Sequence, residues 1–73
     1  MTHVTYHHPS SREIVSDLFT RLRRVDAAGN TVAALAETPG TPESMLADSL
    51  QALEHDLLLA LRAAESARER ITR

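Results

Sequence analysis

The sequence contains no cysteine and no tryptophan, and its only aromatic residues are one phenylalanine and one tyrosine. Without cysteine, neither a disulfide nor a thiolate metal cage can stabilise the chain. With so few aromatic residues, the core of this 73-residue chain must be aliphatic, and one domain at most fits the length.

Lysine is also absent: the eight basic residues are all arginine, against ten carboxylates and four histidines. Such usage is typical of a GC-rich genome. The mildly acidic balance argues against a general nucleic-acid binder, because such proteins carry a clear basic excess.

Long hydrophobic runs are missing as well. No apolar run approaches the roughly 20 residues needed to span a bilayer, and no secretory hydrophobic region follows Met1. We therefore expect no membrane association and a cytoplasmic location.

The most regular pattern lies in the second half of the chain, where apolar residues recur at alternating steps of four and three. This spacing places them on one stripe of a helix, predicted over residues 42–72. The stripe comprises Leu46, Leu50, Leu53, Leu57, Ala60, Ala64, Ala67 and Ile71. No helix buries such a stripe alone, so it needs a partner.

A second helix is predicted over residues 10–37. Ser10 and Glu13 have the spacing of a capping box, which marks the start of the helix. An apolar stripe of the same period follows, flanked by Ile14, Phe19, Ala33 and Leu35, and it comprises Val15, Leu18, Leu22, Val25, Gly29, Val32 and Ala36.

Gly29 and Asn30 leave two alternatives open. The pair either interrupts the helix, which makes a three-helix chain with a bend, or lies inside one continuous helix. We favour the continuous helix because the apolar phase is unbroken across the pair. In that helix Gly29 lies on the stripe, where its missing side chain lets a partner helix come close.

Residues 38–41 form the predicted turn between the helices. The segment from Thr38 to Pro42 holds two prolines and a glycine, so neither helix can pass through it. Thr41 is the expected N-cap of the second helix, with Pro42 as its first residue. A connection this short makes the helices antiparallel neighbours. The alanines of the second helix then face the bulky end of the first, with Ile14, Val15, Leu18 and Phe19.

A two-helix unit of this size buries too little apolar surface to offset its ordering entropy, so self-association is expected. The run Leu57 to Leu61 is apolar almost all round the helix, which is typical of an interface. We predict an all-α antiparallel two-helix hairpin that dimerises into a four-helix bundle. The predicted interface residues are Leu18, Phe19, Leu22, Leu46, Leu50, Leu53, Leu57, Leu58 and Leu61.

Residues 1–9 are predicted to be a flexible arm, because they show no helical or strand period. The arm carries three histidines, His3, His7 and His8, which are the one cluster of candidate metal ligands. The alternatives are a polar tail and an apolar lid in which Val4 and Tyr6 fold back on the bundle. We predict no resident cofactor.

No catalytic constellation is visible. His55 stands between Glu54 and Asp56, but adjacent helix residues diverge, so these three do not form a triad. The chain has no phosphate-binding glycine loop and no pairing of nucleophile and base. We therefore predict that the protein is not an enzyme.

One basic cluster is present, formed by Arg21, Arg23 and Arg24. It is a candidate strip for DNA phosphates. The competing interpretation is a solvated ion-paired surface, since Asp17 lies four residues before Arg21 and no aromatic side chain is interleaved for base stacking.

Two family resemblances follow from short motifs. The segment Arg21 to Asp26, RLRRVD, preceded by a histidine-bearing arm, resembles the first helix of the copper- and nickel-sensing helical repressors, although Ser44 to Leu46 offers no cysteine ligand. The proline turn followed by Leu46-Ala47-Asp48 looks like the needle and small co-chaperone hairpins of type III secretion.

The function we expect is that of a small non-catalytic oligomeric adaptor, docking or chaperone-like protein, as a homodimer or with a larger protein partner. The alternatives implied by the resemblances are a metal-responsive regulator and a secretion-system hairpin.

Overall fold

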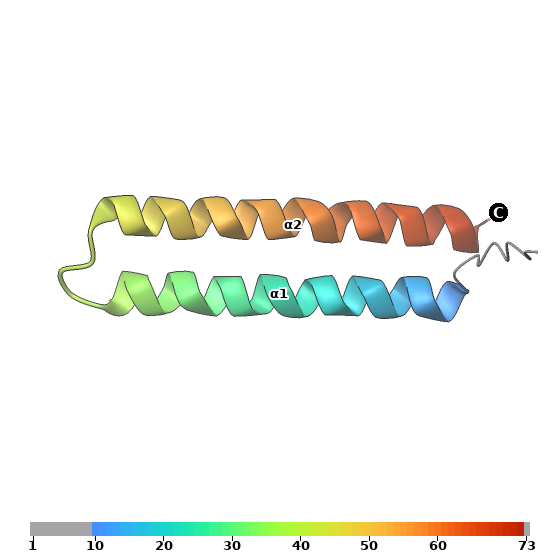
Figure 1. Ribbon diagram of the computed structural model, residues 1–73, viewed down its shortest axis with the longest axis horizontal. Coiled ribbons are helices and arrows are strands. Elements are labelled where there is room, and N and C mark those ends of the chain that lie inside the picture. The colour runs from blue at the N-terminus through green and yellow to red at the C-terminus, as the bar shows by residue number, and fades with distance from the viewer. Residues whose placement is uncertain (1–9, 73) are drawn as a thin grey trace, which may run out of the picture.

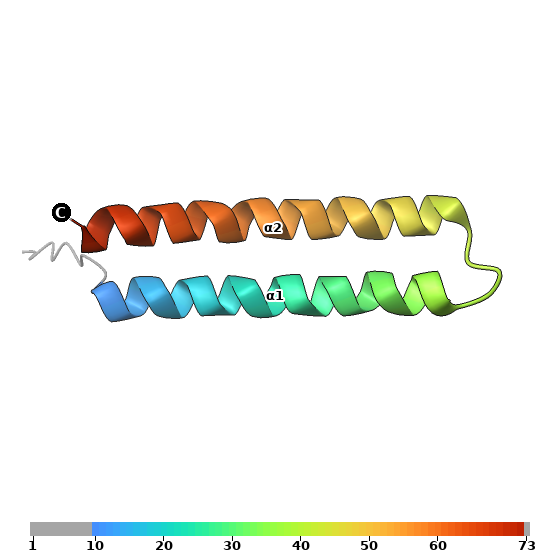
Figure 2. The ribbon, with the colours of Figure 1, turned by 180° about the vertical axis from the view of Figure 1, so that it is seen from behind.

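The computed structural model describes residues 10–72 and contains two long helices, α1 (Ser11–Glu37) and α2 (Glu43–Ile71). The helices lie side by side and antiparallel, joined by one short turn, so that the start of α1 and the end of α2 lie together (Figure 1). The same arrangement is seen from behind in Figure 2. The predicted all-α helical hairpin is therefore confirmed.

The start of α1 is set by Ser10, which is the N-cap. Its hydroxyl oxygen accepts a hydrogen bond from the backbone N–H of Glu13 at 3.2 Å, and its carbonyl accepts one from the N–H of Ile14 at 3.1 Å. The first of these bonds satisfies one of the amide donors that a helix start leaves without partners, and the second is the first bond of the helix itself.

The helix α1 continues through Gly29 without a break. The expectation that a partner helix approaches closely at this residue is wrong for the hairpin. A Cβ atom added at Gly29 would meet nothing within 4 Å, so α2 does not use the space that the missing side chain leaves.

The turn begins at Thr38, the C-cap of α1. Its hydroxyl donates to the carbonyl of Ala34 at 2.7 Å and its backbone N–H donates to that of Leu35 at 3.2 Å. Gly40 follows with a φ of 84°, a conformation that glycine adopts without the steric cost of a side chain. The chain reverses here because the helix is capped and the next residues cannot extend it.

The start of α2 differs from the expected one. Pro42, and not Thr41, is the N-cap, and its carbonyl accepts hydrogen bonds from the N–H groups of Met45 and Leu46. The Thr41 hydroxyl donates instead to the carbonyl of Thr38 at 2.9 Å. Its side chain therefore stabilises the turn, and α2 begins without a side-chain cap.

Each helix contacts the other along a line of half-buried or buried residues with alternating spacings of three and four. We call these the contact lines. They comprise Ile14, Leu18, Arg21, Val25, Ala28, Val32 and Leu35 in α1, and Leu46, Ser49, Leu53, Asp56, Ala60, Ala63 and Ala67 in α2. Such spacing is that of an antiparallel pair of helices packed in heptads.

The contact lines differ from the predicted stripes by one neighbouring row. Leu22 of α1 and Leu50 and Leu57 of α2 were expected on the stripes, but all three are exposed, while Arg21 and Asp56 are half-buried. In α1 apolar residues dominate three neighbouring rows, and in α2 two apolar rows adjoin a mixed row of Ser49, Asp56 and Ala63. One partner helix covers two rows, so the third row lies to one side.

The large residues at the start of α1 lie opposite small residues near the end of α2. Ala60 and Ala67 are 5% exposed and are the only residues between 10 and 72 that are classed as buried. Phe19 was expected to pack there with Ile14 and Leu18, but it is 56% exposed and does not. The hairpin's own core is thus thin, since its two buried residues are both alanines.

Candidate functional site

Eight large apolar side chains are exposed in the part of the chain that the structure describes. Helical geometry places six of them toward one side of the hairpin, although Phe19 and Leu61 lie farther round their helices than the other four. We call this side the apolar face. Its large residues are Phe19 and Leu22 from α1, and Leu50, Leu57, Leu61 and Ile71 from α2.

Helical geometry explains why both helices contribute to one face. Leu22 follows Arg21 of the contact line of α1, and Leu57 follows Asp56 of the contact line of α2, so each occupies the same flanking row. In an antiparallel pair, equivalent flanking rows lie next to each other on the same side. The two third rows therefore merge into one surface.

The apolar face is hollowed beside Phe19. A depression of about 430 Å³ lies along α1 and is lined by Ser11, Arg12, Val15, Ser16, Phe19 and Arg23. The one aromatic ring in the described chain thus borders a shallow depression.

Eight of the nine predicted interface residues divide into two groups. Leu18, Leu46 and Leu53 are half-buried on the contact lines, where they hold the hairpin together. Phe19, Leu22, Leu50, Leu57 and Leu61 lie on the apolar face. Leu58, the ninth, is 43% exposed at the outer edge of α2, because one residue of helix turns it about 100° away from Leu57.

The opposite side of the hairpin carries a polar cleft of about 540 Å³ near the free ends of the helices. It is lined by Glu13, Ile14, Asp17 and Arg21 of α1, and by Leu59, Arg62, Ala63, Ser66 and Arg70 of α2. Met45, the remaining exposed apolar residue, lies on this side too, because it precedes Leu46 of the contact line. One side of the hairpin thus gathers large apolar side chains, and the cleft on the other side is lined largely by charged residues.

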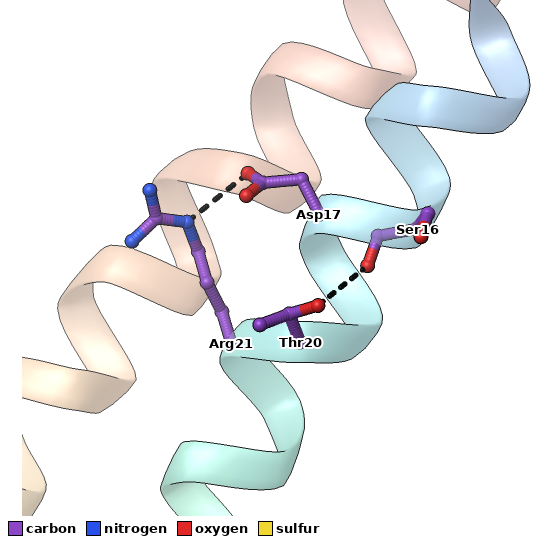
Figure 3. Close-up of polar contacts among 4 residues, drawn as sticks. All are labelled: Ser16, Asp17, Thr20 and Arg21. Atoms are coloured by element: carbon purple, nitrogen blue, oxygen red, sulfur yellow. Dashed lines mark hydrogen bonds and ion pairs between the residues drawn. The ribbon is translucent and has the colours of Figure 1, made fainter.

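Within the cleft, the side chains of Arg21 and Asp17 form the predicted ion pair. Arg21 Nε donates to Asp17 Oδ2 at 3.1 Å, one helical turn apart (Figure 3). The neighbouring hydroxyl of Thr20 donates to the carbonyl of Ser16 at 3.1 Å. Both side chains of the ion pair are partly solvated, so its contribution to stability is small.

The three arginines of the candidate DNA strip do not share one surface. Arg21 lines the polar cleft, whereas Arg23 lines the hollow beside Phe19, on the other side of α1. Arg24 is exposed. A strip that follows one phosphate backbone needs its cations on one side, and Arg21 and Arg23 lie on different sides of the helix.

The other candidate residues can be placed briefly. His55 is exposed on α2. Among residues 10–72, no three side chains of histidine, cysteine, aspartate or glutamate come together as a metal site. His3, His7 and His8 lie outside the described residues.

Within residues 10–72, neither helix combines the length and the hydropathy that crossing a bilayer requires. No family model, no curated protein and no solved structure matches the chain. The function must therefore be argued from the hairpin itself, and the apolar face is its most distinctive surface.

Proposed function

We propose that this protein is a small, non-catalytic protein–protein interaction module that works as a homodimer, with two hairpins joined through the apolar face into a four-helix bundle. The observation that carries the proposal is the gathering of six exposed large apolar side chains on one side. Scattered apolar residues are ordinary on protein surfaces, but a contiguous patch of this kind marks an interface.

The dimensions of the apolar face fit a second copy. It extends along α2 from Leu50 to Ile71, which is about 33 Å of helix, and two adjacent helices are about 20 Å wide. The flat footprint is therefore about 650 Å², and the accessible area of its side chains is larger. A stable interface buries about 800 Å² on each partner, so this face is of the right size.

The thin core of the hairpin also favours self-association. Leu22, Leu57 and Leu61 are each exposed by more than two fifths in the isolated hairpin. In a four-helix bundle the rows of Leu22 and Leu57 point toward the bundle axis, together with the rows of Leu18 and Leu53. The stripe predicted from the sequence consists of these two rows in each helix. Such a stripe suits the core of a four-helix bundle better than the contact between only two helices.

Light scattering coupled to gel filtration tests the proposal. The expected mass is twice the chain's 8.0 kDa. A variant with Leu22→Gln and Leu61→Gln is expected to elute as a helical monomer, because both changes place amides on the apolar face. Met45→Gln is the matched control on the opposite side and is expected to remain dimeric.

A wild-type chain that stays at 8.0 kDa while fully helical contradicts the proposal. In that case the apolar face belongs to a different protein partner or stays uncovered. Equal loss of the dimer in the Met45 control contradicts the assignment of the face.

A further inference from the structure

The apolar face carries a charge pattern that specifies how two copies meet. On each helix, one row of this face has residues seven apart, which is two helical turns, so they lie in line. In α1 the row reads Arg12, Phe19, Asp26, and in α2 it reads Glu54, Leu61, Arg68. The four charged side chains are all exposed.

In both rows an apolar residue stands midway between opposite charges. Phe19 has a cation seven residues before it and an anion seven residues after it, and Leu61 has the reverse. Phe19 and Leu61 also lie at the same level along the hairpin, because the cleft on the other side places Asp17 and Arg21 beside Leu59 and Ala63. A second copy can be related to the first by a 180° rotation about an axis that crosses both helices at the level of these two residues. That rotation places each of the four charges opposite a charge of the other sign.

We infer that the dimer is built about this axis, with α1 over α1 of the second copy, α2 over α2, and the two turns at opposite ends. Arg12 then pairs with Asp26 of the second copy, and Glu54 with Arg68 of the second copy. This inference rests on the proposed self-association and adds the orientation and register of the two hairpins.

The apolar residues fit the same register. Phe19 meets Phe19 of the second copy and Leu61 meets Leu61, at the axis. On either side, Leu57 faces Ala64, which matches a large side chain with a small one, and Leu50 faces Ile71. Every large exposed residue of the apolar face on α2 thus has an apolar partner.

The other symmetric arrangement places both turns at the same end, with α1 over α2 of the second copy. Its apolar contacts are also good, because Phe19 faces Leu61 and Leu22 faces Leu57. Its charges, however, are all opposed: Arg12 faces Arg68, and Asp26 faces Glu54. Like charges directly opposite each other are destabilising, so the charge pattern selects the arrangement with turns at opposite ends.

A distance between spin labels measures the arrangement directly. Because the chain has no cysteine, Glu37→Cys gives one labelling site per copy, at the turn end of α1. Glu37 lies 18 residues from Phe19, so the labels should be about 54 Å apart. Turns at the same end would bring them within about 20 Å, which overturns the inference.

Two further outcomes of the label experiment are informative. A distance of about 39 Å would mean that the hairpins overlap along their full length about a midpoint near Arg24, which contradicts the register. No dipolar coupling at all would mean that no dimer forms, and the proposed function then fails together with this inference.

Charge reversal gives an independent test, because it should change the dimer dissociation constant in opposite directions for the two arrangements. With turns at opposite ends, Glu54→Arg and Arg68→Glu should each raise the dimer dissociation constant about tenfold, since two rim pairs become repulsive. The double variant should restore it to within about twofold. With turns at the same end, each single change creates an attractive pair and tightens the dimer, which refutes the inference.

Discussion

The neighbouring leucines Leu57 and Leu58 provide a matched test of the apolar face. They are 48% and 43% exposed and belong to the same helix, but Leu57 lies on the apolar face and Leu58 on the outer edge of α2. Replacing either one by glutamine removes the same hydrophobic side chain from nearly the same exposure. Only Leu57→Gln should affect the dimer.

The exposed fraction of Leu57 sets the expected change in the dimer dissociation constant. Complete burial of a leucine side chain stabilises by about 1.5 to 3 kcal/mol. Because Leu57 is already about half-buried in the hairpin, covering the rest of it in the dimer contributes about 1 kcal/mol per copy. Two copies give about 2 kcal/mol, so Leu57→Gln should raise the dissociation constant about 30-fold.

Sedimentation equilibrium at several chain concentrations measures this constant, and circular dichroism at high concentration checks that each variant stays helical. Leu58→Gln should leave the constant within about threefold of wild type, which corresponds to less than about 0.7 kcal/mol. Equal weakening by the two variants, or no weakening by Leu57→Gln, would refute the assignment of Leu57 to the interface.

Three local features of the hairpin give further predictions, each measured by urea unfolding at one fixed chain concentration, because the stability of a dimer depends on concentration. Gly29→Ala should stabilise the folded protein by about 1 kcal/mol per chain, since the added methyl group meets nothing within 4 Å and alanine has the higher helix propensity. Destabilisation would show that a partner approaches Gly29. Gly40→Ala should destabilise by about 1 kcal/mol, because a φ of 84° is strained for alanine, and an unchanged midpoint would contradict that turn geometry. Ser10→Ala should cost about 1 kcal/mol through loss of the N-cap, while Ser11→Ala, one position later, should have little effect.

Much of the hairpin follows from local sequence signals. The Ser10 and Glu13 spacing marks the beginning of α1, and the prolines and glycine between Thr38 and Pro42 mark the reversal. These signals depend on backbone chemistry within a few residues, so they can be read without knowledge of the partner. The cap of α2 was missed by one residue because Thr41 bonds back to Thr38 instead of forward.

The rotation of the helices about their own axes could not be predicted in the same way. An apolar stripe that adjoins rows of small or mixed residues indicates a buried side but does not say which two rows meet the first partner. Arg21 and Asp56 entered the contact lines for this reason, although each is charged. The charged row of Arg12 and Asp26 was also missed, and its signal in the sequence is the seven-residue spacing about Phe19.

The most direct test of the central claim is an isotope-filtered NOE experiment on a mixture of labelled and unlabelled chains, which detects only contacts between copies. We predict intermolecular NOEs from the Phe19 ring and from the methyl groups of Leu57 and Leu61. Leu58 and Met45, which are exposed elsewhere, should show none. Contacts between copies confined to those two residues, or no such contacts at all, would contradict the claim that a second copy covers the apolar face.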